Sequence, residues 1–224
     1  MNGLQSVETS YATELIRKGI HMSSLAIPVV YYFITRETAL SILIPLLLLF
    51  GISDLARIFI PSFGSFYERW FGFLLRRHER AEQGHRRLNG ATYVLLSATL
   101  CVWLFPKMIV LTAFAILIVS DTAAALVGRK FGKHRLMQHK SIEGSTAFFI
   151  SALIVVAIAP KVQYLPLEYV IGTVAALVGA VVEAVSGEMI DDNLSIPLSI
   201  ALVMWGLYAL LLPTLSFVAL EGLQ

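Results

Sequence analysis

The amino-acid sequence predicts an all-α fold: a polytopic membrane helical bundle of about seven transmembrane helices, formed by a single domain over residues 1–224. Composition is the first reason, since 57% of the residues are hydrophobic, only 14% are charged, and the mean hydropathy is +0.77. A soluble domain carries about 25% charged residues because its surface faces water. The second reason is that the apolar residues form long stretches. The sequence therefore excludes a soluble globular enzyme, and a net charge of +2 argues against a nucleic-acid partner.

Seven apolar stretches approach the length of about 20 residues that a helix needs to cross a hydrocarbon core of about 30 Å. They are Leu15–Ile34, Thr38–Ile60, Gly90–Phe105, Met108–Val127, Thr146–Ala159, Val170–Val185 and Ile196–Leu212. Prolines follow several of them and separate one span from the next. The first stretch has no small-residue cleavage site and is interpreted as a retained span. The lack of a long N-terminal presequence favours a prokaryotic plasma membrane.

The basic residues predict the orientation, because Lys and Arg concentrate in the cytoplasmic loops of membrane proteins. Thirteen of the seventeen Lys and Arg residues fall at the N-terminus or in the loops after the second and fourth spans. Arg36, Lys107 and Lys161 fall on the opposite side, and Arg57 lies within the second span. This asymmetry predicts a cytoplasmic N-terminus.

The segment 61–89 is too charged to span the membrane. Its aromatic residues mix with arginines in a pattern typical of an amphipathic helix that lies in the membrane interface. A basic anchor on anionic lipid head groups is one interpretation. A lid or lipid-entry gate over a site in the bundle is the other.

Ionisable residues within the predicted spans need a reason, because each costs roughly 2.5–3.5 kcal/mol to insert. The first span opens with ELIRKGIH, whose spacing places its charged residues on one helical face. The predicted topology brings all such residues to the cytoplasmic leaflet, which indicates a polar site there. They are Glu14, Arg17, Lys18, His21, Asp54, Arg57, Asp121 and Glu183, followed by Asp191, Asp192 and Asn193. For Asp54 and Arg57 alone, a structural ion pair is an equally good interpretation.

The acid of the sixth span follows a line of small residues. Gly172, Ala176, Gly179 and Glu183 share one helical face. Small residues allow helices to approach closely, so we expect Glu183 to face a neighbouring helix rather than lipid.

The segment 128–145 has the composition of a loop that binds nucleotide phosphates. Its glycines would let backbone N–H groups approach phosphate oxygens, and its cations would offset the phosphate charge. The candidate residues are Gly128, Arg129, Lys130, Gly132, Lys133, Lys140, Ser141, Glu143 and Gly144. The spacing is not that of a Walker A loop. An ordinary basic loop would explain the cations but not the glycines, Asp121 or Glu143.

Several motifs resemble one enzyme family along nearly the whole chain. They are ELIRKGIH, DLAR at 54–57, LNGATY at 88–93, DTAAALVGRKFGK with KSIEGS, and Glu183 followed by DNLSIP at 192–197. Together they resemble the CTP-dependent lipid-alcohol kinases, which include dolichol kinase, phytol kinase and the yeast-type diacylglycerol kinase. Phosphatidate cytidylyltransferases are distant relatives, but their C-terminal signature is absent here, which favours phosphoryl transfer over nucleotidyl transfer.

The resemblance implies transfer of the γ-phosphate of CTP to the hydroxyl of a polyprenol, a phytol-type isoprenol or a diacylglycerol. Magnesium would be held by Asp121 with Asp192, or with Glu183 in place of Asp192. The candidate bases are Asp54, Glu183 and Asp192, and the sequence does not choose among them.

The same resemblance assigns the remaining polar residues to the substrates. Arg17, Lys18, His21 and Arg57 would bind phosphate or orient the acceptor, and Asn193 would contact the nucleotide. The alternatives are a cytidylyltransferase and a transporter. A transporter would place its charges near the midplane, often within inverted repeats.

Overall fold

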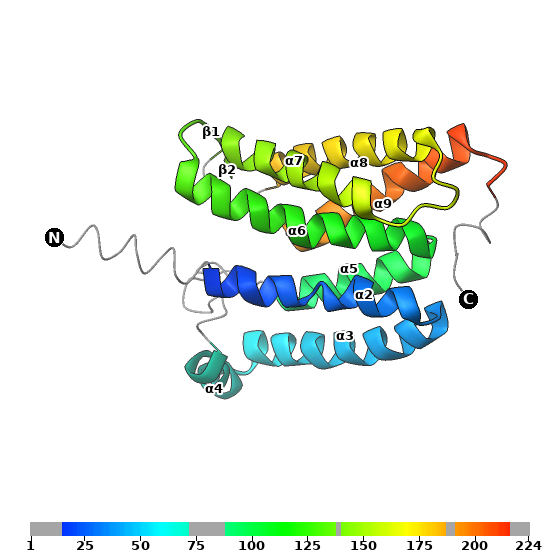
Figure 1. The fold of residues 1–224 in the computed structure, drawn as a ribbon. Coiled ribbons are helices and arrows are strands. Elements are labelled where there is room, and N and C mark those ends of the chain that lie inside the picture. The colour runs from blue at the N-terminus through cyan, green and yellow to red at the C-terminus, as the bar shows by residue number, and fades with distance from the viewer. Residues whose placement is uncertain (1–14, 72–87, 138–139, 187–190, 216–224) are drawn as a thin grey trace.

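The computed structural model describes residues 15–71, 88–137, 140–186 and 191–215. Its described part is a bundle of helices with one small antiparallel hairpin (Figure 1). A helix over residues 15–23 comes first. The labelled elements are α2 (Ala26–Phe33), α3 (Arg36–Phe59), α4 (Pro61–Phe71), α5 (Gly90–Leu104), α6 (Lys107–Phe131), β1 (Arg135–Met137), β2 (Lys140–Ser141), α7 (Ile142–Ile158), α8 (Pro166–Val185) and α9 (Asp192–Leu211). Residue 14 and most of the predicted interfacial segment, residues 72–87, lie outside the described residues.

The membrane class is confirmed by the length and composition of these helices. Within the described residues, α3, α6, α8 and α9 are long and apolar enough to cross a membrane, and α5 and α7 are shorter apolar helices. The first predicted span is interrupted at residues 24–25, where the Ser24 N–H donates to the carbonyl of His21. The number of seven spans therefore stays a prediction.

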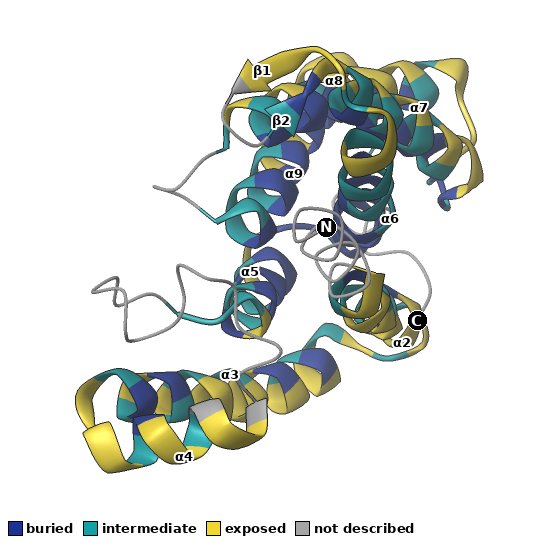
Figure 2. Ribbon diagram, turned by 90° about the vertical axis from the view of Figure 1, so that its left-hand side faces the viewer, coloured by how far each residue is buried: buried dark blue, intermediate teal, exposed yellow. Residues whose placement is uncertain are grey.

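Helix α6 is the centre of the bundle, and it packs against α7, α9 and α2. Ile109, Phe114 and Leu117 are fully buried along it. By contrast, α3 packs mainly along α5 and presents most of its surface outward, as does α4 (Figure 2). The exposed Phe66, Arg69 and Trp70 give α4 the mixed apolar and basic character that the sequence predicts.

Polar caps fix where three helices begin. The side chain of Asn89 accepts from the backbone N–H of Ala91, that of Ser141 from Gly144 and that of Asp191 from Asn193. Each cap satisfies a backbone N–H group that the first turn of a helix leaves unpaired. These caps start α5, α7 and α9 at the end of the bundle that carries Asp121, Glu183 and Asp192.

The three basic residues predicted on the opposite side all bind helix C-termini. Arg36 donates to the carbonyl of Phe105, the residue that ends α5, and Lys107 donates to Ile34, which ends α2. Lys161 donates to the carbonyls of Val156 and Ala159 at the end of α7. Carbonyls at a helix C-terminus lack intrahelical partners and carry partial negative charge. A structural role therefore accounts for these three cations.

The glycines of the predicted phosphate loop lie at a close crossing of helices. Helix α6 extends to Phe131, past the predicted end at Val127, so the prediction that Gly128, Arg129 and Lys130 lie in a loop is wrong. The helix continues because these residues keep its backbone bonds until Gly132 ends it. A Cβ atom on Gly144 would lie 3.3 Å from the Cα atom of Gly128 in α6. The glycines thus allow α7 to approach α6.

We expect Gly144→Ala to lower the free energy of unfolding by about 1–3 kcal/mol, because overpacking a tight contact is destabilising. The added Cβ would lie 3.0 Å from the backbone oxygen of Ala124, which has no rotamer by which to move away. The measurement is thermal unfolding of the detergent-solubilised protein. Gly206→Ala is the matched control, since a Cβ there meets no described atom within 4 Å. Equal unfolding temperatures for both variants would contradict the close approach.

Candidate active site

The first half of the candidate site joins the N-terminal helix to α6. Lys18 lies on the helix over residues 15–23, and its Nζ atom contacts the Oδ2 atom of Asp121 in α6 at 2.5 Å. The Nε2 atom of His21, one turn further along, lies 3.5 Å from the same oxygen. Both Lys18 and Asp121 are buried. Arg17 is half-buried on the same helix.

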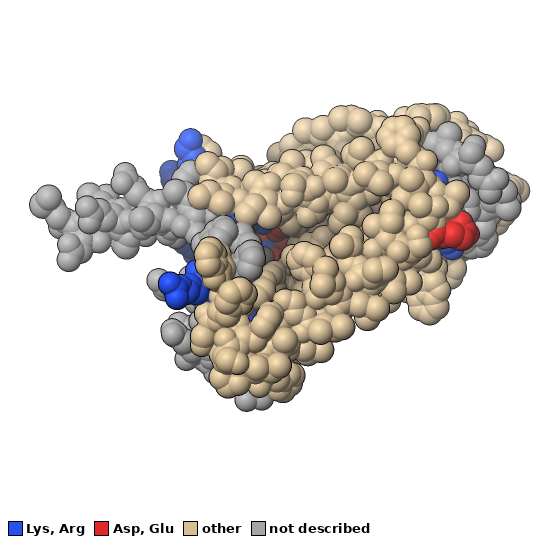
Figure 3. Space-filling view, turned by 90° about the horizontal axis from the view of Figure 1, so that it is seen from below, with Lys and Arg blue, Asp and Glu red and all other residues tan. Residues whose placement is uncertain are grey.

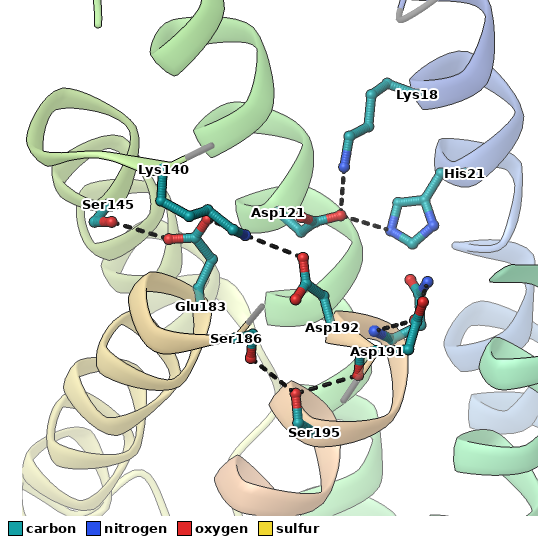
Figure 4. A network of polar contacts seen from close by, with 11 residues as sticks. Lys18, His21, Asp121, Lys140, Ser145, Glu183, Ser186, Asp191, Asp192 and Ser195 are labelled. Carbon is teal, nitrogen blue, oxygen red and sulfur yellow. Dashed lines mark hydrogen bonds and ion pairs between the residues drawn. The ribbon is translucent and has the colours of Figure 1, made fainter. Parts of the chain in front are cut away.

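The second half of the site is built around Lys140, on β2. Its Nζ atom donates to Glu183 of α8 at 2.6 Å and to Asp192 of α9 at 3.0 Å. The hydroxyl of Ser145, in the first turn of α7, donates to the other oxygen of Glu183 at 2.9 Å. Figure 4 shows Lys140 reaching toward Glu183 and Asp192, with Asp121 close by and pointing toward Lys18 and His21. Residues far apart in the sequence thus form one polar cluster.

The acids of the cluster keep Lys140 protonated. Burial opposes its charge, but the attraction of Asp192, Glu183 and Asp121 outweighs burial and holds the pKa of Lys140 above its ordinary value. Lys140 therefore stays protonated at neutral pH and offsets the charge of the acids around it. Each acid of this cluster lies next to a cation. A phosphate group that entered the cluster would attract the same cations.

Asp54 and Arg57 belong to a separate cluster at the end of α3. The Oδ1 atom of Asp54 lies 3.2 Å from Nε of Arg57, and both residues are buried. The Oδ2 atom accepts from the backbone N–H of Asn89 at 2.7 Å and from the Thr92 hydroxyl at 2.6 Å. Tyr67 of α4 adds its ring to the Arg57 guanidinium, with 5.6 Å between the guanidinium carbon and the ring centroid. The Asp54 carboxylate therefore joins α3 to α5, and Arg57 adds the contact with α4.

The two clusters meet where α5 and α9 begin. A Cβ atom on Gly90 would lie 3.4 Å from the amide nitrogen of Asn193. Asn193 is itself held by Asp191, whose Oδ1 atom accepts from both its backbone and its side-chain N–H groups. The Asp54 cluster therefore adjoins the helix end that carries Asp192.

The remaining loop residues take two positions. Arg129, Lys130 and Lys133 are exposed. Ser141 is buried between α6 and α7, and its hydroxyl would lie 2.7 Å from a Cβ on Gly132. Glu143 pairs with His134 at 2.7 Å and also accepts from the His134 backbone N–H, so it closes the turn after α6.

Sequence reasoning did not select His134, Ser145, Asn89 or Thr92. Ser145 is the last residue of the KSIEGS motif, and Asn89 and Thr92 lie within the LNGATY motif. Their positions within these motifs could have marked them as candidate site residues. Their hydrogen bonds to acids could not be predicted, because those depend on how the helices pack.

Within the described ranges, no group of three or more His, Cys, Asp or Glu side chains is arranged to hold a metal ion. Magnesium needs no such group, because it usually binds through one or two carboxylates together with substrate phosphates. Asp121, which contacts Lys18 and His21, and Asp192, which contacts Lys140, fit that mode.

Comparison with known proteins identifies relatives over most of the chain. An uncharacterized protein of Rickettsia prowazekii is 35% identical over 187 residues, which cover 83% of this chain and 90% of the relative. The CTP-dependent diacylglycerol kinase 1 of Saccharomyces cerevisiae is 29% identical, over 85% of this chain and 72% of its own length. The dolichol kinase of Schizosaccharomyces pombe is 33% identical over 52% of this chain and 24% of its own. No family model and no solved structure matches the chain. The chain is a member of the CTP-dependent lipid kinase family.

Proposed function

We propose that this protein is a membrane lipid kinase that transfers the γ-phosphate of CTP to the hydroxyl of a lipid alcohol. The acceptor class comprises diacylglycerol, polyprenols and phytol-type isoprenols. The kinase relatives support the reaction type and CTP as the donor. The observation that carries the assignment to a site is the cluster in which Lys18, Lys140 and three acids from separate helices meet.

The ion pairs of the cluster suit a site that exchanges partners when a nucleotide binds. Lys18 contacts Asp121, and Lys140 contacts both Glu183 and Asp192, so each carboxylate has a cationic partner without ligand. Bound phosphates would attract Lys18, His21 and Lys140, and the carboxylates would then be available to a cation. Phosphoryl transfer depends mainly on such positioning and on charge neutralisation.

Asp121 and Asp192 would hold Mg²⁺, together with oxygens of the nucleotide phosphates. When bound, the ion supplies neutralisation of the negative charge on the transferred group. Asp121 lies between Lys18 and His21, which would bring the ion next to the groups that we assign to phosphate binding.

We assign the proton acceptor to Glu183. Asp54 already accepts from three donors in a separate cluster. Of the two acids bound to Lys140, the Glu183 side chain is 4% exposed and that of Asp192 is 14% exposed. We therefore assign Asp192, the more exposed acid, to the metal ion, and Glu183, the more deeply buried acid, to the lipid hydroxyl. In the reaction, the bond between the γ-phosphorus and the β,γ-bridging oxygen breaks, a bond to the lipid oxygen forms, CDP leaves and Glu183 takes the hydroxyl proton.

The membrane arrangement that we propose follows the charge asymmetry. The chain would cross the bilayer seven times with its N-terminus inside, which places the polar cluster at the cytoplasmic leaflet. A lipid hydroxyl lies near that interface and the nucleotide reaches it from the cytosol. Helix α4, with Phe66, Arg69 and Trp70 exposed, would lie in the interface as an anchor.

A transfer assay tests the function. Detergent-purified protein with γ-labelled CTP, magnesium and a panel of diacylglycerol, phytol and a polyprenol is expected to place label in a lipid product, and chelation of magnesium should stop the transfer. Pyrophosphate release and a CDP-lipid on addition of phosphatidate would instead assign a cytidylyltransferase. No product in either assay would contradict both enzymatic functions.

A further inference from the structure

Helix α3 has a packing face that is buried at both ends and open in the middle. Ala39, Leu43, Leu46, Phe50, Asp54 and Arg57 follow one another at spacings of 4, 3, 4, 4 and 3 residues, which places them on one face of the helix. Ala39 and Leu43 are buried at one end of this face, and Asp54 and Arg57 at the other. Between them, Leu46 is 37% exposed and Phe50 is 39% exposed.

The whole middle of α3 lacks buried residues. Every residue from Ile44 to Ser53 is described, and none of them is buried. A Cβ atom on Gly51 would meet no described atom within 4 Å. This face is buried at both ends, and its centre is apolar and not buried; we call that centre the α3 window and define it by Leu46, Phe50 and Gly51.

The window leads toward the polar end of the bundle. Along the helix axis, Phe50 lies about 6 Å and Leu46 about 12 Å from the level of Asp54, at 1.5 Å per residue. The Asp54 cluster adjoins the start of α9, which carries Asp192. Figure 3 looks at the side of the bundle that carries α3 and shows a hollow in the apolar surface, with acidic and basic atoms visible inside it.

We infer that the α3 window holds the hydrocarbon chain of the acceptor lipid alcohol and lets it enter sideways from the bilayer. This inference rests on the proposed function, which requires a hydroxyl at the polar cluster and a chain at the depth of the membrane. A lipid alcohol has that polarity: one polar end, and an apolar chain that the leucine and phenylalanine of the window contact. Bulk phospholipid against α3 is the competing occupant.

The kinetic test places a larger side chain in the α3 window. Leu46→Trp is expected to lower kcat/KM for a long-chain diacylglycerol by at least roughly tenfold, through KM, since a change of one methylene in an apolar pocket already carries such a factor. The KM for CTP should stay unchanged. Leu48→Trp is the matched control, because Leu48 lies two residues away on the opposite face and is 57% exposed. Equal kinetics for the two variants would overturn the inference.

A binding test separates the window from the reaction. A diacylglycerol with a diazirine on its acyl chain is photolysed with the wild-type protein in vesicles, with or without excess unlabelled diacylglycerol. We expect labelling at Leu46, Phe50 and Gly51 that the excess competes away, and that Leu46→Trp reduces. Uncompeted labelling of both faces would assign bulk phospholipid to the window. Competed labelling without phosphoryl transfer would overturn the proposed kinase function and keep the lipid site.

Discussion

Asp121→Asn is expected to reduce phosphoryl transfer by roughly 1000-fold or more, because losing a carboxylate at the proposed magnesium site would remove several kcal/mol of charge stabilisation. Asn keeps the size of the side chain but not its charge, so Lys18 and His21 lose their anionic partner. The loss should appear in kcat, measured with saturating γ-labelled CTP and diacylglycerol in detergent.

Ser120→Ala is the matched control for this variant. Ser120 is adjacent in α6 and buried, and its hydroxyl has no hydrogen-bond partner among the described residues. Its removal should leave both the unfolding temperature and kcat close to those of the wild type. If Asp121→Asn retained substantial activity at an unchanged unfolding temperature, Asp121 would have to be removed from the metal site.

The sequence predicts the helices well because hydrophobicity over long windows is a local property. The predicted starts and ends of α5, α7 and α8 lie within four residues of those observed, and the polar caps Asn89, Ser141 and Asp191 explain where α5, α7 and α9 begin. The break in the first span was not predicted. Its turn depends on backbone bonds around Ser24 that apolar composition does not encode.

The roles of the glycines could not be read from spacing. Gly128 and Gly144 suggested a phosphate loop because glycine permits close approach by any group. The structure shows that they approach each other, across α6 and α7. By contrast, the small face of α8 predicted its contacts correctly, since a Cβ on Gly172 would meet Val156 of α7 and one on Gly179 would meet Ile200 of α9.

The composition of the polar cluster was predictable in part. A charge in a membrane span demands a partner, so Lys18, Asp121 and Glu183 could be selected one at a time. Which charges pair depends on how the helices pack. Asp54 shows this, since the sequence allowed both a catalytic base and a structural ion pair, and the contacts favour the second.

Asp54→Ala is expected to destabilise the protein by about 3–5 kcal/mol, because removing one partner of a buried ion pair is strongly destabilising. Arg57 loses its carboxylate, and the Asn89 N–H and the Thr92 hydroxyl lose their acceptor. The unfolding temperature in detergent should fall.

The double variant Asp54→Leu with Arg57→Met should recover much of the loss, since apolar residues can replace a buried ion pair at little cost. A structural carboxylate predicts that activity returns with stability in the double variant. An unfolding temperature that is unchanged in Asp54→Ala, with turnover abolished in both variants, would instead make Asp54 the catalytic base.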